Sequence, residues 1–115
     1  MSEKTLFEKI ADREIPGEFV YEDARCFCIR DISPQAPVHL LLIPKKAIAR
    51  LGAATDEDRE LLGHLMTRVP LIAAQEGVSE KGFRVVINSG PNAGEVVPHL
   101  HLHLLGGHRL HEPMG

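Results

Sequence analysis

The spacing of apolar residues predicts a short helix near the beginning of the 115-residue chain. The apolar positions that recur there at helical intervals are Leu6, Phe7, Ile10 and Ala11. Thr5 stands directly before them and is a residue type that caps helix N-termini well. Pro16 and Gly17 follow as a breaker pair, so the helix is expected to end there.

Shorter runs predict three strands in the first half of the chain. Glu18–Glu22 and Arg25–Arg30 are strand-like and are expected to form a hairpin around a two-residue turn. Residues 31–37 are too rich in proline for regular structure and are expected to form a loop. Val38–Ile43 is almost entirely apolar, as an interior strand should be, and Pro44 is expected to terminate it.

A long helix is predicted from Thr55 to Gln75, with acidic residues in its first turn and Gly77 just past its end. The stripe expected to face the core consists of Leu62, Leu65, Met66, Val69, Ile72 and Ala73. The side chains outside this stripe are Leu61, His64 and Leu71. Because Pro70 lacks the N–H of a helical hydrogen bond, a kink or break is expected at that position.

Two further strands are expected at Gly82–Asn88 and Val97–Leu105, on either side of a loop at Ser89–Gly94. The order is one helix, three strands, one helix and two strands. Strands joined by short turns pair antiparallel, and the helices pack on the sheet that they form. The sequence therefore predicts a single α+β domain over residues 1–115, a five-stranded antiparallel sheet with two helices.

Composition and charge narrow the class of protein. Lys+Arg 13 against Asp+Glu 16 give a formal net charge of -3 without a strongly basic stretch, which disfavours binding of long nucleic acid. No segment approaches the roughly 20 apolar residues that span a bilayer, and the charged start lacks the apolar run of a signal peptide. Cys26 and Cys28 are too close along one strand to bridge without strain. We therefore expect a cytoplasmic protein with reduced thiols and no membrane association.

The most informative segment is Val97–Leu105, in which histidines alternate with leucines. Side chains of a strand point alternately to opposite faces, so the leucines are expected to face the core. His99, His101 and His103 would then share the other face, with successive imidazoles about 7 Å apart.

Three interpretations of this histidine face are open. A purely structural strand gains little from adjacent imidazoles, which repel one another once one is protonated. A metal site is chemically reasonable, since histidine is the commonest metal ligand, and Cys26 or Cys28 could add a ligand. In a catalytic site, one neutral imidazole acts as nucleophile or base while its neighbours orient it and bind anionic oxygen. The loop Ser89–Gly94 favours catalysis, because such loops let backbone N–H groups approach a phosphate.

The segment His99–Leu105 resembles the His-φ-His-φ-His-φ-φ signature of the histidine triad (HIT) superfamily, where φ is an apolar residue. Gly106-Gly107 directly after it is similar to the Hint branch, nucleoside phosphoramidate hydrolases, more than to the Fhit-like dinucleoside polyphosphate hydrolases. Further segments that resemble Hint sequences are Glu14–Pro16, Arg30–His39, Ile43–Lys46 and Leu62–His64. The resemblance covers nearly the whole chain, in order.

The resemblance implies a role for each matching residue. His101 is similar to the nucleophile that attacks the α-phosphorus and becomes nucleotidylated, and His103 to the histidine that contacts the phosphate and assists the leaving group. His99 and His39 match the pair that orients and polarises the nucleophile. Asp31 matches the acid that holds the ribose hydroxyls. The residues similar to those around the purine are Phe7, Ile10, Ile15 and Ile32, and those similar to ribose or phosphate contacts are Asn88, Gly94 and Val96.

The chain departs from the family pattern just before the triad and at its end. The family usually carries Gln followed by Ser, Thr or Glu, where this chain has Glu95 and Val96. Loss of an amide or hydroxyl removes a possible phosphate donor, and the Glu95 carboxylate adds negative charge near an anion. The terminal segment Leu110–Gly115 lacks the tryptophan found in some members' tails.

The function expected from the resemblance is hydrolysis of a purine nucleoside phosphoramidate, such as AMP joined to an amine, through a covalent nucleotidyl-His101. This mechanism requires no metal or other cofactor. Two alternatives are a Fhit-like hydrolase of dinucleoside polyphosphates and a nucleotide-binding regulatory or scaffold protein with residual activity. The resemblance also implies a two-fold homodimer, for which Leu61, His64 and Leu71 would leave apolar surface on the long helix.

Overall fold

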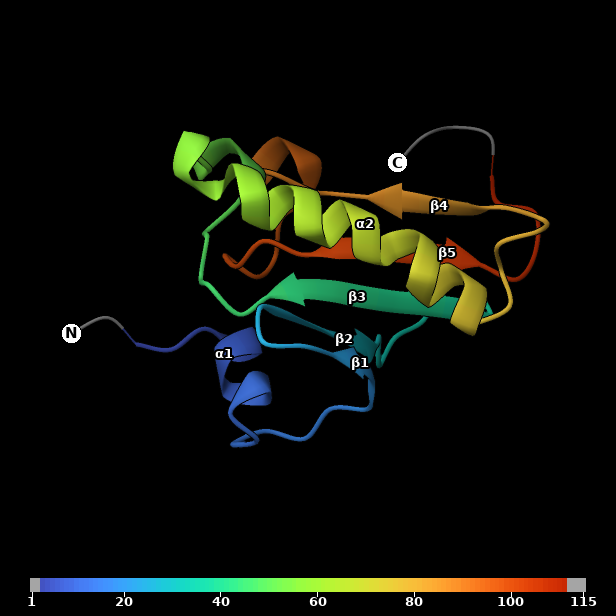
Figure 1. Cartoon of the computed structure of the whole chain (residues 1–115), viewed down its shortest axis with the longest axis horizontal. Helices are drawn as coiled ribbons and strands as arrows, with labels where there is room; N and C mark the ends of the chain where they lie inside the picture. Colours follow the sequence, from blue (N-terminus) through green and yellow to red (C-terminus); the bar gives the residue numbers. More distant parts are fainter. Residues whose placement is uncertain (1–2, 112–115) are drawn as a thin grey trace.

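The computed structural model describes residues 3–111, which form one antiparallel sheet with two α-helices packed on it (Figure 1). In chain order the elements are α1 (Leu6–Ala11), β1 (Phe19–Glu22), β2 (Cys26–Arg30), β3 (Val38–Pro44), α2 (Arg59–Gln75), β4 (Phe83–Val86) and β5 (Leu102–Gly106). The strand order is β1-β2-β3-β5-β4, and each neighbouring pair is antiparallel. The predicted α+β fold with five strands and two helices is confirmed. The first two residues and Glu112–Gly115 lie outside the described residues, so the domain limits 1–115 stay a prediction.

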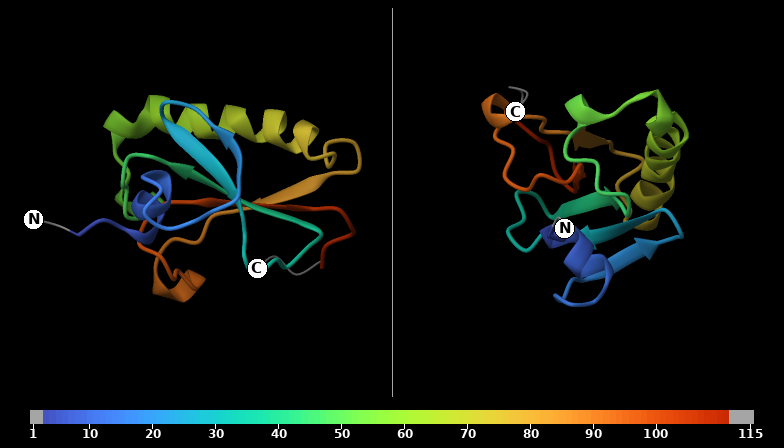
Figure 2. Two further views of the ribbon diagram at one scale, coloured as in Figure 1. Left: turned by 90° about the horizontal axis from the view of Figure 1, so that it is seen from below. Right: turned by 90° about the vertical axis from the view of Figure 1, so that its left-hand side faces the viewer.

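The two helices cover opposite faces of the sheet (Figure 2). Alternate residues of β2 and β3 point to the two sides, as the pleat of a strand requires. The buried strand residues that pack with α2 are Cys26, Cys28, Leu40, Leu42, Leu102 and Leu104. Those that pack with α1 are Phe27, Ile29, Leu41 and Ile43. The α2 side is therefore the larger core, and the α1 side carries a smaller cluster beside an open space.

Helix α1 begins with a capping box. The Thr5 hydroxyl accepts a hydrogen bond from the Glu8 backbone N–H at 3.1 Å, and the Glu8 carboxylate accepts one from the Thr5 N–H at 2.8 Å. These bonds satisfy two N–H groups that would otherwise lack partners in the first turn. The helix is only six residues long, so capping and packing rather than intrinsic helix propensity hold it.

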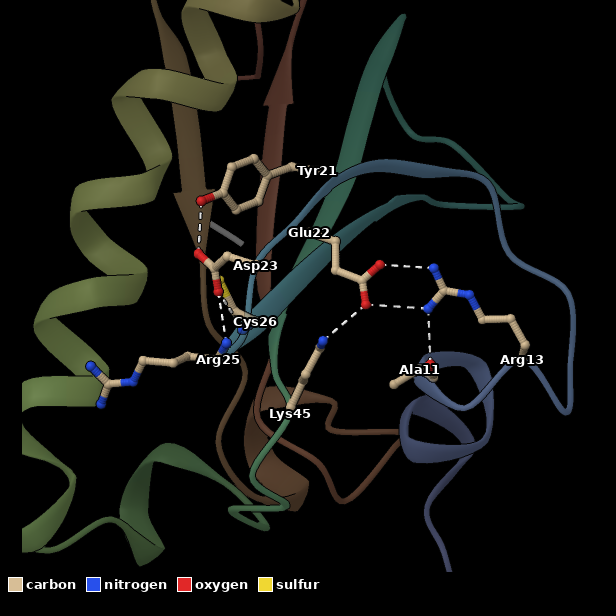
Figure 3. A network of polar contacts seen from close by, with 8 residues as sticks. All are labelled: Ala11, Arg13, Tyr21, Glu22, Asp23, Arg25, Cys26 and Lys45. Carbon is tan, nitrogen blue, oxygen red and sulfur yellow. Dashed lines mark hydrogen bonds and ion pairs between the residues drawn. The ribbon is translucent and has the colours of Figure 1, made fainter.

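The end of α1 is fixed by Arg13, which adopts a left-handed conformation with a φ of 63°. The Arg13 N–H donates to the Ile10 carbonyl, and the Glu14 N–H donates to the Lys9 carbonyl. These two hydrogen bonds form a Schellman motif. The Arg13 guanidinium then binds Glu22 of β1 at 2.8 Å (Figure 3). The helix thus ends at Ala11, before the Pro16–Gly17 pair that was expected to end it. Local backbone capping closes the helix before the breaker pair is reached.

Helix α2 is continuous through Pro70, so of the expected kink or break the break is wrong and the kink stays a prediction. Pro70 is exposed, as is Met66 one turn earlier, so the carbonyl that loses its partner can be solvated. The face of α2 that is buried also differs from the predicted stripe: Leu61 is 6% exposed and Met66 is 53% exposed. The buried residues of α2, Leu61, Leu65, Val69, Ile72 and Ala73, lie three or four residues apart, as one helix face requires.

The last strand is shorter than predicted, because β5 begins at Leu102 and not at Val97. Its pairing with β3 runs from Val38–Gly106 to Leu42–Leu102 and stops there. Two residues further in the same register, Leu100 would lie opposite Pro44, which has no N–H to donate. The Pro44 carbonyl instead accepts a hydrogen bond from the His99 ring at 2.8 Å, and the Leu100 N–H donates to Ile48 at 2.7 Å. The first two histidines therefore lie on an irregular segment in front of the strand.

Candidate active site

The sheet face beside α1 borders a cavity of about 650 Å³. Its largely apolar walls come from α1, β2, β3 and the segment that precedes β5. The predicted site residues that line it are Phe7, Ile10, Ile15, Asp31, Ile32, Asn88, Gly94, Val96, His101 and His103. Residues predicted from distant parts of the sequence therefore border one space. His39 and His99 do not border it and are buried behind its wall.

The rim of the cavity carries apolar side chains in contact with solvent. Ile32 is 97% exposed and Val96 is 87% exposed, more than any other large apolar residue among those described. Beside Ile32, the Asp31 carboxylate accepts a hydrogen bond from the Ser33 N–H at 2.8 Å and lies 3.4 Å from His39 Nε2. A carboxylate flanked by exposed apolar surface suits a ligand with a hydroxylated part and an apolar part.

The protonation of His39 and His103 can be assigned from a chain of hydrogen bonds. The Gln35 backbone N–H donates to His39 Nδ1 at 3.0 Å, so the proton of the neutral His39 ring lies on Nε2. His39 Nε2 lies 2.9 Å from His103 Nδ1 and donates to it. The proton of His103 consequently lies on Nε2, the nitrogen free to meet a ligand. Burial lowers the pKa of both rings, that of His103 to about 4 with help from the neighbouring histidines, so both are neutral at pH 7.

His101 is oriented by the backbone rather than by another imidazole. Its Nδ1–H donates to the His99 carbonyl at 2.8 Å, which leaves the Nε2 lone pair of the neutral ring unused. Its ring lies against Phe7, with centroids 5.0 Å apart, and against His103, with centroids 5.1 Å apart. His101 thus presents an acceptor nitrogen beside the His103 N–H donor.

The three triad histidines share the face opposite the leucines, as expected, but only His101 and His103 border the cavity. His99 is completely buried, and its two ring nitrogens bond to Thr5 Oγ1 and to the Pro44 carbonyl. Its side chain still lies on the α1 side together with His101, since Phe7 contacts both rings, but it does not border the cavity. The His39 ring contacts His103 and not the expected His101.

The loop before the triad is held largely by hydrogen bonds within residues 90–95. The backbone N–H groups of Gly90, Ala93, Gly94 and Glu95 all donate to acceptors within residues 90–95. Gly94 has a φ of 79°, which a residue with a side chain rarely adopts. Asn88 donates to the Ala93 carbonyl at 2.9 Å, so it also fixes the loop. Three amides of the loop Ser89–Gly94, which was expected to present N–H groups to a phosphate, therefore hold the loop instead.

The Glu95 carboxylate is neutralised within the protein. Arg50 binds it through two nitrogens, at 2.8 and 3.0 Å, and the Gly90 N–H donates to it at 2.9 Å. These contacts, the guanidinium first, lower the pKa of Glu95 to about 2. The negative charge expected near an anion is thus compensated by Arg50, a partner 45 residues away in sequence.

Two clusters in the described part of the chain bring three possible metal ligands within 4.8 Å of one another. One consists of Asp31, His39 and His103, and the other of Asp23, Cys26 and His64. In both, the donor atoms already bond to one another, so an ion would have to replace those bonds. Cys26 and Cys28 pack on the α2 side, opposite the cavity, and cannot join ligands on the histidine side. Burial raises the pKa of both thiols to about 12.

Several residues of the cavity wall were not predicted. They include Leu6, Pro16, Gly17, Ile29, Arg30, Ser33, Leu41, Glu95 and Val97. Strand register explains two of them, because Leu41 pairs with both Ile29 and His103 and so shares a face with them. Gly17 is required by space, since a Cβ atom there would lie 2.8 Å from Ile10. Once the strands are paired, the alternation of residues predicts that Leu41 and Ile29 face the cavity. It does not predict that Gly17 lies there.

Comparisons with known proteins agree with this architecture. Residues 12–110 match the model of the HIT domain family. The chain is 58% identical over the full length of both proteins to an uncharacterized HIT-like protein of Synechococcus elongatus. It is 44% identical to the purine nucleoside phosphoramidase of Escherichia coli, with 96% of this chain and 92% of that protein covered. A HIT family hydrolase from Legionella pneumophila has a TM-score of 0.94 at 48% identity, with 97% of this chain and 100% of that chain covered.

The sheet, the histidine triad and the cavity beside α1 define a histidine-triad fold. The chain belongs to the HIT domain family, as the family model and the identities establish. The resemblance to the HIT superfamily is thereby confirmed, and the identity to the Escherichia coli protein supports the Hint-like assignment. Within residues 3–111, no helix is both long and apolar enough to cross a membrane.

Proposed function

We propose that the protein hydrolyses purine nucleoside phosphoramidates or related adenylylated compounds through a covalent nucleotidyl-His101. The observation that carries this proposal is that two neighbouring imidazoles at the cavity differ in tautomer, so that one offers an acceptor nitrogen and the other a donor nitrogen. The fixed Nδ1–H of His101 leaves Nε2 as an acceptor, and the bond from His39 leaves Nε2 of His103 as a donor. A nucleophile beside a proton donor is what substitution at phosphorus requires. Similarity to a purine nucleoside phosphoramidase supports the substrate class.

In the proposed reaction, His101 Nε2 attacks the α-phosphorus and the bond from phosphorus to the amine nitrogen breaks. The neutral His103 ring donates its Nε2–H as a hydrogen bond to the phosphoryl oxygens, and the leaving nitrogen takes from water the proton with which it departs as a neutral amine. Water then attacks the phosphorus of nucleotidyl-His101. The products are a nucleoside monophosphate, the amine and the regenerated imidazole. Because burial keeps His39 and His103 neutral at pH 7, the site starts in the form that this sequence of steps needs.

The cavity accounts for the nucleotide part of the proposed substrate. Phe7, Ile10 and Ile15 provide apolar wall for a purine, and the exposed Ile32 covers its rim. The Asp31 carboxylate retains acceptor capacity for the ribose hydroxyls beyond its bond to Ser33. Asn88, Gly94 and Val96 also line the cavity and would lie near ribose or phosphate.

The proposal is tested by comparing three activities of the purified protein. Adenosine 5′-phosphoramidate and a diadenosine polyphosphate are offered as substrates, and binding of AMP is measured separately. We expect a kcat/KM for the phosphoramidate at least ten-fold above that for the polyphosphate. The reverse preference would assign the protein to the Fhit-like class, and AMP binding without turnover of either compound would make it a regulatory nucleotide binder.

We also propose that the protein forms a two-fold homodimer. Strand β4 lies at the edge of the sheet, where its outer backbone groups have no strand partner among residues 3–111. Phe83 at its start is 36% exposed, and Leu71 of α2 is 46% exposed. The expected contribution of Leu61 and His64 is wrong, because Leu61 is buried and His64 bonds to Asp23 at 2.7 Å. Sedimentation at micromolar concentration should give twice the monomer mass, and a monomer would refute the dimer.

The cytoplasmic location stays a prediction.

A further inference from the structure

Thr5 connects helix α1 directly to the histidine triad. Its hydroxyl oxygen lies 2.6 Å from Nδ1 of His99, a residue 94 positions later in the chain. The same oxygen accepts the hydrogen bond from the Glu8 N–H that caps α1. One side chain therefore holds both the start of the helix and a completely buried imidazole. Sequence reasoning assigns Thr5 only the capping role.

The direction of the bond between Thr5 and His99 follows from the other ring nitrogen. His99 Nε2 lies 2.8 Å from the Pro44 carbonyl, which can only accept, so the ring proton lies on Nε2. His99 Nδ1 is then an acceptor, and the Thr5 hydroxyl must donate to it. Burial lowers the pKa of His99, which agrees with a neutral ring. Both ring nitrogens are satisfied, and the ring is fixed at two points.

The backbone of His99 in turn orients His101. The His99 carbonyl is the acceptor for His101 Nδ1–H, at 2.8 Å. A shift or rotation of His99 moves this carbonyl, which determines both the direction of the His101 ring and which of its nitrogens carries the proton. Phe7, two residues after Thr5, also contacts both rings, with centroids 5.8 Å from His99 and 5.0 Å from His101. The first turn of α1 thus supports the segment that carries the proposed nucleophile.

We propose that Thr5 is a positioning residue for His101 and acts through the tautomer and placement of His99. This inference rests on the proposed function, since it assigns Thr5 a part in the same reaction. Thr5 makes no contact with the substrate in this scheme. Its hydroxyl keeps His99 Nδ1 paired, so that the His99 carbonyl holds His101 with Nε2 towards the phosphorus. A displacement of about 1 Å in such a group reduces rates by roughly 100-fold.

Two variants of Thr5 and one control separate positioning from helix capping. Thr5→Val keeps the shape and removes the hydroxyl, and Thr5→Ser restores the hydroxyl. Glu8→Ala removes the other half of the capping box, the bond from the Thr5 N–H, while leaving the Thr5 hydroxyl in place. Glu8 does not line the cavity. Its carboxylate acts on His99 only through its charge, so Glu8→Ala controls for loss of helix stability with the bond from Thr5 to His99 kept in place.

We expect Thr5→Val to lower kcat for adenosine 5′-phosphoramidate by about 10- to 100-fold while AMP affinity changes less than about three-fold. Thr5→Ser and Glu8→Ala should each retain kcat within about three-fold, even where Glu8→Ala lowers the Tm as much as Thr5→Val does. In nitrogen NMR spectra, the ring signals of His99 and His101 should both shift in Thr5→Val and return in Thr5→Ser.

The positioning role is overturned if Thr5→Val keeps wild-type kcat, or if Glu8→Ala loses as much activity as Thr5→Val. Unchanged His101 ring signals in Thr5→Val would overturn it as well. If the wild-type protein does not turn over the phosphoramidate, the proposed function fails by itself. The NMR comparison of wild type with Thr5→Val then still decides whether Thr5 positions His101.

Discussion

The two faces of the sheet differ in the length of the helix that covers them. On one face the 17-residue helix α2 seals alternate residues of β2, β3 and β5 into a continuous core. On the other face the six-residue helix α1 covers only part of the sheet, and a cavity of about 650 Å³ remains. Leu102 and Leu104 point to the first face, whereas His101 and His103 border the cavity. A single run of alternating residues thus serves packing on one side and the proposed chemistry on the other.

The side chains on the α2 face are held by apolar contacts, whereas the histidines on the α1 face are held by hydrogen bonds. The imidazoles on the α1 side of the sheet are held by the Gln35 N–H, by the His99 and Pro44 carbonyls and by the Thr5 hydroxyl. The bonds to the Gln35 N–H and to the two carbonyls also determine which ring nitrogen carries a proton. Substitutions on the two faces should therefore damage different properties of the protein.

The largest effect is expected for His101→Asn, on the cavity face. It removes the proposed nucleophile but keeps a polar side chain, so kcat should fall by about 10⁴- to 10⁶-fold. AMP binding should change only a few-fold, and the free energy of unfolding by less than about 1 kcal/mol. Steady-state kinetics, calorimetric titration with AMP and urea denaturation measure the three quantities. His99→Asn and His39→Asn should be milder, with His103→Asn in between; a His101→Asn protein with wild-type turnover would remove His101 from the mechanism.

The matched substitution on the core face is Leu104→Ala. Leu104 is 3% exposed and packs with α2, so its truncation should lower the free energy of unfolding by about 2–5 kcal/mol. At temperatures where the variant is folded, kcat should stay within about ten-fold of wild type. Urea denaturation and kinetics on the same preparation check both values. A loss of activity equal to that of His101→Asn would show that the two faces are not independent.

Asp31→Asn sharpens the comparison within the cavity. If the carboxylate binds both ribose hydroxyls, the variant should lose about 1–3 kcal/mol of AMP binding, because a charged acceptor becomes a neutral one. The amide oxygen can still accept from the Ser33 N–H, so the local turn should be kept. Deoxy-AMP, which already lacks one hydroxyl, should lose much less. Equal losses for the two nucleotides would show that Asp31 does not contact the ribose.

The smallest effect concerns pH and the buried histidines. Burial lowers the pKa of His39 and His99, and that of His103 to about 4, against about 6.5 in the unfolded chain. The unfolded chain binds more protons below pH 6.5, so stability is complete above that pH and is lost as pH falls towards 4. Each histidine contributes up to about 1.4 kcal/mol per pH unit. Urea denaturation at pH 7, 6 and 5 should show the free energy of unfolding falling as the pH falls. In His103→Asn the slope should be smaller by the contribution of about one proton. An unchanged slope in that variant would contradict the assignment.

The core face could be predicted from the sequence more completely than the cavity face. The alternation of Leu100, Leu102 and Leu104 marks a buried face, and the strands β1 and β2 begin within one residue of their predicted starts. Periodicity could not predict that the strand begins at Leu102, because this depends on the missing N–H of Pro44 across the sheet. Periodicity also could not predict three hydrogen-bond partners. Thr5 bonds to His99 and Arg50 to Glu95 across long distances in sequence, and Gln35 bonds to His39 through its backbone N–H.

The central claim, a covalent intermediate on His101, is tested most directly by trapping it. Wild-type protein is mixed with adenosine 5′-phosphoramidate labelled in the adenosine, quenched in alkali to preserve phosphohistidine and digested for peptide mapping by mass spectrometry. We predict label on the peptide that contains His99, His101 and His103, with fragmentation placing the nucleotidyl group on His101 alone. Label on another residue, or rapid turnover with no labelled protein at any time point, would contradict the account.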